Sequence, residues 1–215
     1  FLSRQDPLFC DLWMQNYFST YLHRDVRQLF PKLNDDAFGR FIKMLAFSSG
    51  QIIKFSDFSR ALGVSEPTVR SYFEIAEGTF FWRKIPSYEK SQKKRLVKAP
   101  RGYIRDSGLI ISLLEIPTVD LLRSHPHFGY IWESFVMEQL IKGFQSQLIR
   151  IKYSYYRTHN QAEIDLILEG AFGCVPIEIK AGSLARPQSL RALQEFIVDY
   201  DCPIGILVNQ AKEIA

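Results

Sequence analysis

Acidic and basic side chains recur at strand spacing within residues 162–180, whose sequence is AEIDLILEGAFGCVPIEIK. The glycines at either end of GAFG predict a four-residue turn between two strands. The first strand is predicted to run from about residue 155 to 169, and the second is predicted to end at Lys180. The question is which of the charged side chains this hairpin places side by side.

Paired carboxylates on neighbouring strands suit a hard divalent cation. In a regular antiparallel register, Asp165 lies opposite Glu178 and Glu163 opposite Lys180, all on one face. Like charges in that position destabilise a sheet, so the two acids require a cation such as Mg²⁺ or Mn²⁺ between them. Lys180 would then stabilise a phosphoryl oxygen or orient a water. A one-residue slip would separate the acids, and a solvated ion pair between Glu163 and Lys180 is the alternative.

A third carboxylate is predicted on the apolar face of a helix at residues 129–144. At about 100° per residue, Glu133 shares a face with Trp132 and Val136, whereas Glu138 points to the other side. A buried carboxylate is costly unless a cation, a donor or a proton compensates it. Glu133 therefore either joins the acids of the hairpin or pairs with a buried arginine or caps a strand. The opposite face of the hairpin is predicted to be the core side, formed by Ile164, Leu166, Leu168, Val175, Ile177 and Ile179.

The first half of the chain predicts a helix-turn-helix. Two helices with apolar stripes, 11–30 and 35–48, precede a short helix at 56–62. Gly63 then suits a helix C-cap, and Ser65 suits the N-cap of a second helix that reaches about residue 76. This order is typical of a helix-turn-helix unit.

Two predicted strands joined by a basic loop follow, as in the β-wing of a winged helix, over about residues 79–105. The second helix and this wing form a candidate surface for nucleic-acid phosphates. A solvated hairpin tip and a protein-interaction module are the alternatives. The candidate nucleic-acid-binding residues are Arg70, Lys93, Lys94, Arg95, Lys98 and Arg101.

Length and composition predict a soluble globular protein of one large or two small domains: 215 residues, 47% hydrophobic and 23% charged. Two prolines break the pattern at 115–127, which predicts a helical and winged-helix domain at 1–114 and an α/β domain at 115–215. His125 and His127 suit a polar linker better than a metal site. Neither a signal peptide nor an apolar run of about 20 residues is present, so we expect a cytoplasmic protein without membrane contact.

A helix acid at Glu133, Asp165 within EID, and EIK at residues 178–180 together resemble the motif of the PD-(D/E)XK nuclease superfamily. Over nearly the whole chain, an ordered series of segments resembles the C-terminal domain of unknown function that follows an AAA-type ATPase domain in prokaryotic proteins. The series includes FIKMLAFSSGQIIKFSDFSRALGVSEPTVRSYFEIAEGTFF, KRLVKAPRGYIRDSGLI, FGYIWESFVMEQL and YYRTHNQAEIDLIL.

This resemblance implies an α+β and α/β fold: a winged helix followed by a PD-(D/E)XK restriction-endonuclease-like mixed β-sheet flanked by helices. It implies metal ligation by Glu133, Asp165 and Glu178, with Lys180 completing the catalytic group with Asp165 and Glu178. It implies DNA or RNA as partner and an ATPase domain in cis; ATP belongs to that domain alone, since this chain has no GxxxxGK[ST]. A Mg²⁺-dependent phosphodiesterase and an inactive scaffold that regulates the ATPase both remain open, as does a homo-oligomer.

Overall fold

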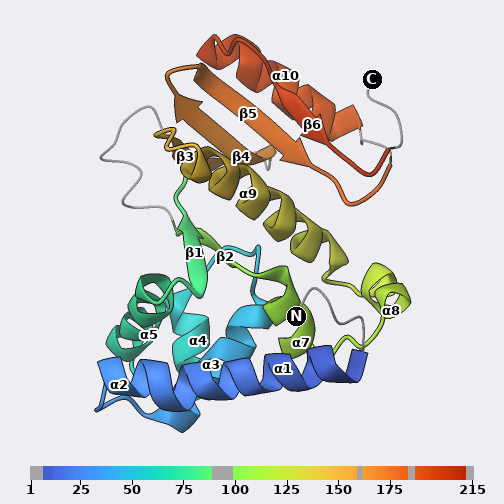
Figure 1. Cartoon of the computed structure of the whole chain (residues 1–215). Helices are drawn as coiled ribbons and strands as arrows, with labels where there is room; N and C mark the ends of the chain where they lie inside the picture. The colour runs from blue at the N-terminus through green and yellow to red at the C-terminus, as the bar shows by residue number, and fades with distance from the viewer. Residues whose placement is uncertain (1–6, 89–98, 159–161, 184–186, 212–215) are drawn as a thin grey trace.

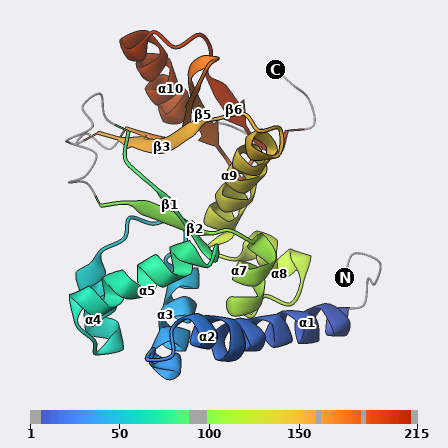
Figure 2. The ribbon, with the colours of Figure 1, turned by 60° about the vertical axis from the view of Figure 1, so that its left-hand side comes forward.

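The computed structural model describes residues 7–88, 99–158, 162–183 and 187–211 of the chain. It has a mixed α+β fold with a helical N-terminal part and a sheet-containing C-terminal part (Figure 1). The long helix α9, Phe128–Ser146, runs between the two parts in both views of the ribbon (Figures 1 and 2). Among the described residues, no helix is both long enough and apolar enough to cross a membrane.

The N-terminal part buries the apolar stripe of the predicted helix at 35–48, whereas Trp13, Tyr17 and Leu29 of the predicted helix at 11–30 are exposed. Phe38 and Phe41 of α3 are fully buried, and Phe41 contacts Phe73 edge-to-face with the ring centres 4.9 Å apart. The predicted helix at 11–30 begins earlier and contains a π-helical segment, η1. The elements are α1 Pro7–Thr20, η1 Tyr21–Val26, α2 Arg27–Leu29, α3 Asp35–Phe47, α4 Phe55–Leu62, α5 Glu66–Gly78, α7 Ser107–Leu113 and α8 Val119–Ser124.

Capping residues set the ends of α4, α5 and α7, and Gly63 and Ser65 do so as predicted. Gly63 ends α4 in the left-handed conformation, with φ of 67°. The side chain of Ser65 accepts a hydrogen bond from the Thr68 N–H at the start of α5, and Asp106 accepts one from the Leu109 N–H at the start of α7. The short helix α8 lies inside the predicted linker, where the Thr118 side chain provides an N-cap.

Two short antiparallel strands, β1 Trp82–Ile85 and β2 Arg101–Ile104, follow the α4–α5 pair. Figure 2 shows them between the N-terminal helices and the C-terminal sheet. Tyr103 and Ile85 pack with apolar side chains of α9 and the C-terminal sheet, whereas Trp82 and Ile104 pack with the N-terminal helices. The strand pair therefore belongs to both cores. The predicted loop between the strands, at 89–98, lies outside the described residues.

The C-terminal sheet has the strand order β3-β4-β5-β6, with the pair β5–β6 parallel and the others antiparallel. Val136, Met137 and Ile141 of α9 pack on one face, and Phe196 of α10 packs on the other (Figure 1). The bounds are β3 Lys152–Arg157, β4 Glu163–Gly170, β5 Gly173–Ile179, α10 Pro187–Tyr200 and β6 Ile206–Val208.

The single strand predicted at 155–169 is in fact parts of two strands. The chain reverses direction after β3, where the Thr158 N–H donates to the Ala162 carbonyl. The strand predicted at 155–169 ran through the polar sequence THNQ at 158–161. This polar run is the sequence signal of the reversal. The predicted β4–β5 register is confirmed from Leu166 opposite Ile177 to Gly170 opposite Gly173.

Candidate functional site

Four carboxylates meet two cations and a tyrosine where α9, β2, β4 and β5 come together. Glu133, Asp165 and Glu178 are each at most 7% exposed. All four residues of the predicted site, including Lys180, are linked through ion pairs with other members of this group. We call the group the acid cluster; its members are Glu133, Glu163, Asp165, Glu178, Lys180, Arg101 and Tyr103.

A β-bulge positions Asp165. Ser154 pairs with Ile167 and Tyr156 pairs with Ile164, so one residue of β3 faces two residues of β4, Asp165 and Leu166. A bulge of this kind re-aims a side chain that a regular strand would direct elsewhere. It explains why Ile164 packs with the α10 side of the sheet while Leu166 packs with the α9 side, although a single predicted core face contained both.

Both oxygens of the Asp165 carboxylate have partners. Oδ1 lies 3.6 Å from Nη1 of Arg101, and Oδ2 lies 3.5 Å from Nζ of Lys180. Oδ2 also accepts a hydrogen bond of 2.9 Å from the backbone N–H of Ile179. Asp165 is thus tied to β2 and to the end of β5 and provides the centre of the cluster.

The predicted direct opposition of the acids is wrong in detail. The β4–β5 ladder ends at Leu166, so Asp165 does not pair with Glu178 across it. Instead Lys180 joins them, with Nζ 2.6 Å from Oε1 of Glu178 and 3.5 Å from Asp165. Glu163 pairs with Arg101 rather than with Lys180.

Arg101 lies inside the protein, 7% exposed, and its placement corrects its assignment to a nucleic-acid surface. Nη1 lies 3.3 Å from Oε1 of Glu133, and Nη2 forms an ion pair with Glu163. Burial lowers the pKa of Arg101, but the neighbouring groups, Tyr103 and Glu133 foremost, outweigh it and raise the pKa. The guanidinium therefore stays charged. Two of the alternatives for Glu133 hold together: it joins the acids and it pairs with a buried arginine.

Glu133 is a carboxyl group of the cluster with a strongly perturbed proton affinity. Burial, reinforced by the charge of Asp165, raises the pKa of Glu133 to about 8, although Arg101 and a hydrogen bond from the Tyr103 hydroxyl oppose this. Burial and the charge of Glu133 likewise raise the pKa of Tyr103, so the phenol stays protonated and donates.

Glu133→Gln is expected to remove a pH dependence of stability. Because the pKa of Glu133 rises from 4.5 to about 8, the folded protein holds this proton more tightly than the unfolded chain does. The resulting stabilisation is full below the unfolded value near 4.5 and is lost as the pH rises through about 8. Between about pH 5 and about pH 9, the wild type should lose on the order of 3 kcal/mol relative to the glutamine variant.

Urea unfolding of both proteins at the two pH values measures this difference. Glu195→Gln, an exposed acid of α10 paired with Arg191, serves as the control and should parallel the wild type. Parallel profiles for Glu133→Gln and the wild type would show that Glu133 ionises with an ordinary pKa.

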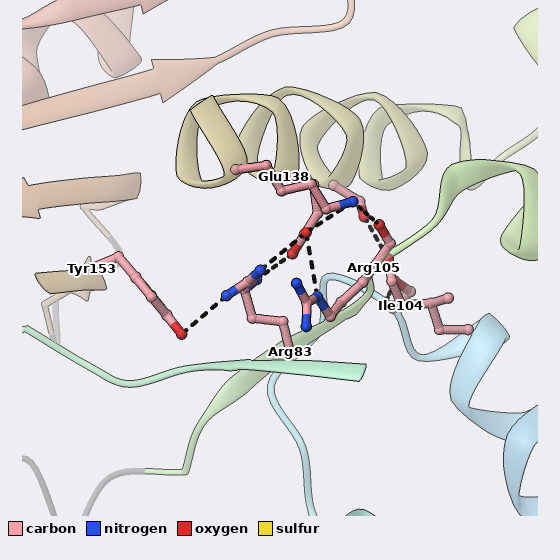
Figure 3. A network of polar contacts seen from close by, with 8 residues as sticks. Arg83, Ile104, Arg105, Glu138 and Tyr153 are labelled. Carbon is pink, nitrogen blue, oxygen red and sulfur yellow. Dashed lines mark hydrogen bonds and ion pairs between the residues drawn. The ribbon is translucent and has the colours of Figure 1, made fainter. Parts of the chain in front are cut away.

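A second network fastens α9 to the strand pair β1–β2. Glu138, 3% exposed, receives two hydrogen bonds from Arg83, while Arg105 and Lys142 lie 3.5 Å and 3.3 Å from its Oε2 (Figure 3). Glu138 was predicted on the side of the helix opposite the apolar face, and β1–β2 covers that side. We call Glu138, Arg83, Arg105, Lys142 and Tyr153 the arginine network.

The candidate nucleic-acid residues fall into three groups. Arg70 lies on α5 with its side chain 55% exposed and its guanidinium 4.2 Å from the ring centre of Phe55. Arg101 is buried in the acid cluster. The remaining residues lie outside the described part of the chain: Lys93, Lys94, Arg95 and Lys98.

The residues of the acid cluster, as arranged, do not fit a metal ion. Among the residues that the structure describes, no group of three or more His, Cys, Asp or Glu side chains is placed to hold one. The Arg101 guanidinium lies between Glu133 and Asp165, and the Lys180 ammonium lies between Asp165 and Glu178. A divalent cation needs carboxylate oxygens at about 2.0–2.6 Å from itself. Here the side chains of Arg101 and Lys180 occupy the space between the carboxylates in which such an ion would bind.

Sequence reasoning missed the participation of Arg101 and Tyr103 in the acid cluster. Their signal was present, since residues two apart on a strand share a face. Arg101 was instead grouped with the basic loop because the run of basic residues at 83–105 dominated the pattern. Arg83 and Arg105, from the same run, lie in the arginine network.

Comparisons with known proteins identify domains without an assigned activity. The model of a domain of unknown function, DUF8612, matches residues 3–120, and that of another, DUF4143, matches residues 128–215. An uncharacterized protein of Mycobacterium tuberculosis, Rv2008c, is 32% identical over 187 residues, and an uncharacterized protein of Mycobacterium bovis, Mb2031c, matches equally. Each match covers 87% of this chain and 41% of the relative. No solved structure matches the chain significantly.

Proposed function

Because the chain belongs to the DUF8612 family of domains of unknown function, we propose its function from its own geometry. The chain serves as a nucleic-acid-associated module of a larger prokaryotic AAA-type ATPase. Its PD-(D/E)XK-like unit acts as an ion-paired scaffold that does not cleave nucleic acid. The observation that carries the scaffold role is that Arg101 and Lys180 bridge the carboxylates that a nuclease would use for metal.

The order of elements supports the likeness on which this proposal depends. An acid on a helix, Glu133, meets Asp165 on one strand and the sequence EIK at the end of the next. In the N-terminal part, the capped pair α4–α5 followed by the antiparallel pair β1–β2 matches the order of a winged helix. The larger protein is supported by the relatives, of whose length the chain spans 41%.

Nucleic-acid association is proposed for the surface of α5 and the loop at 89–98. Arg70 presents an exposed guanidinium there, and the loop carries Lys93, Lys94, Arg95 and Lys98. Positive side chains on such a surface bind phosphates independently of base sequence and release counterions. Binding should therefore weaken steeply as salt increases.

Arg70→Ala is expected to weaken binding to duplex DNA by roughly 3–10-fold and to reduce the salt slope by about one. Fluorescence anisotropy with labelled duplexes, single-stranded DNA and RNA at several salt concentrations provides the measurement. Arg191→Ala is the matched control, because Arg191 is an exposed arginine of α10, far from α5 (Figure 1). Wild-type protein that binds none of these nucleic acids would exclude the association.

Metal-dependent phosphodiesterase activity is the second candidate, favoured by the convergence of Glu133, Asp165, Glu178 and Lys180. Incubation of plasmid DNA and of RNA with the protein and Mn²⁺ or Mg²⁺ separates the two functions. The scaffold role predicts intact substrates. Nicking that Asp165→Asn abolishes, with the fold retained by circular dichroism, would establish the nuclease instead.

A further inference from the structure

Arg101 joins two segments that match different family models. It lies in the part of the chain matched by DUF8612, whereas the carboxylates that it contacts lie in the part matched by DUF4143. It contacts Glu133 on α9 as well as Glu163 and Asp165 on β4. One guanidinium thus holds a helix and a strand of the C-terminal part against β2.

The Arg101 guanidinium is surrounded by carboxylates, as a bound metal cation would be. Nη1 lies 3.3 Å from Glu133 and 3.6 Å from Asp165, so this one nitrogen occupies the space between two carboxylates. Nη2 pairs with Glu163. A guanidinium provides several N–H donors in a fixed plane, which suits simultaneous contact with several carboxylates better than a lysine would.

The surroundings of Arg101 keep the side chain in this place. Its backbone pairs with Ile85 in β1 and bridges Ile52 on the other side. Its guanidinium carbon lies 5.5 Å from the ring centre of Tyr155, within range of a cation–π contact. Tyr103, two residues along β2, donates to the same carboxylate, that of Glu133. Backbone pairing and side-chain contacts therefore fix Arg101 from several directions.

We propose that Arg101 is the built-in cation of the acid cluster: it takes the place of a divalent metal ion between Glu133 and Asp165 and fastens the two family domains together. This deepens the scaffold role in the proposed function. The cluster excludes a divalent ion as long as β2 stays in place, since the guanidinium and a hydrated ion cannot occupy the same space. Removing the guanidinium leaves Glu133, Glu163 and Asp165 without the cation that they share and creates a site for one.

Arg101→Gln tests this proposal by thermal unfolding with and without Mn²⁺. The variant should have a lower Tm than the wild type, and Mn²⁺ at about 100 times its dissociation constant should raise the variant's Tm by about 5–10 °C. The wild-type Tm should not respond. Electron paramagnetic resonance of free Mn²⁺ should show one ion bound per chain of the variant and none bound to the wild type.

Two further variants control for general destabilisation. Arg83→Gln removes an equally buried arginine of the neighbouring strand, for which Glu138 is the one carboxylate partner among the described residues. Its Tm should fall without a response to Mn²⁺. The double variant Arg101→Gln with Asp165→Asn should lose the response.

A folded Arg101→Gln protein that binds no Mn²⁺ would overturn the proposal, as would one Mn²⁺ bound to the wild type. If Arg101→Gln does not fold, the wild-type titration alone decides between these outcomes, because bound Mn²⁺ contradicts the proposal and its exclusion supports it. The experiment contains no nucleic acid, so its result is independent of whether the protein binds DNA or RNA.

Discussion

Replacing Gly102 with alanine is expected to lower the thermal unfolding midpoint by about 6–12 °C, which corresponds to a loss of about 3 kcal/mol. A Cβ atom at this position would lie 1.6 Å from Cζ2 and 2.0 Å from Cε2 of Trp82. The indole cannot move aside, because it is 2% exposed and packs against Phe73 with the ring centres 5.0 Å apart. Strand β2 would have to shift, and with it Arg101 and Tyr103 on either side of Gly102.

Gly143→Ala is the matched control for this prediction. Gly143 lies within α9 and is exposed, and apart from its own stretch of helix no described atom lies within 4 Å of the position of an added Cβ. Its replacement should stabilise the helix by about 0.5–1 kcal/mol. Adding Trp82→Leu to Gly102→Ala should cost less than the sum of the two single changes, since leucine lacks the overlapping ring atoms. Additive losses would show that the close approach of Trp82 does not determine the cost.

Local features of the fold could be predicted from the sequence because their causes lie within a few residues. Gly63 and Ser65 act at helix ends through their own conformation or side-chain oxygen, and both were predicted correctly. The turn at GAFG fixed the β4–β5 register near the turn for the same reason. Short-range chemistry was sufficient for these elements.

The position of Asp165 could be predicted only in part. Its convergence with Glu178 and Lys180 followed from the turn, but its final contacts depend on a bulge opposite β3. A bulge arises from the fit between two strands and has no fixed sequence signature. The strand β3 itself was merged with β4 in the prediction, so its pairing could not be considered.

Arg101 was missed as a cation of the acid cluster because it comes from the other part of the chain. Arg101 and Glu133 are separated by 32 positions, and only the packing of β2 on α9 brings them together. A helical wheel marks Glu133 as buried among apolar residues, but it contains no information about the partner. The same packing buries Glu138, which a wheel alone places opposite the apolar face.

Glu138→Gln is expected to destabilise the protein by about 3–5 kcal/mol, although the side chain keeps its shape. The Arg83 guanidinium, 7% exposed, would lose its carboxylate and remain buried with the hydroxyl of Tyr153 as a hydrogen-bond partner at 3.2 Å. An uncompensated buried charge costs far more than an exposed ion pair contributes. Thermal unfolding should show a fall in Tm of about 6–20 °C.

The large loss of stability should arise because the buried charge of Arg83 is left without a carboxylate, rather than from the loss of the Arg83–Glu138 ion pair itself. The double variant Glu138→Gln with Arg83→Met should therefore recover most of the lost stability, because an apolar side chain of similar length leaves no buried charge. Glu195→Gln on α10 removes the acid of an exposed ion pair. Oε1 of Glu195 lies 2.8 Å from Nε of Arg191, and the side chains of Arg191 and Glu195 are 80% and 55% exposed. It should change stability by less than about 1 kcal/mol. If Glu138→Gln costs no more than Glu195→Gln, the arginine network does not hold α9 against β1–β2, and the acid cluster must provide that attachment.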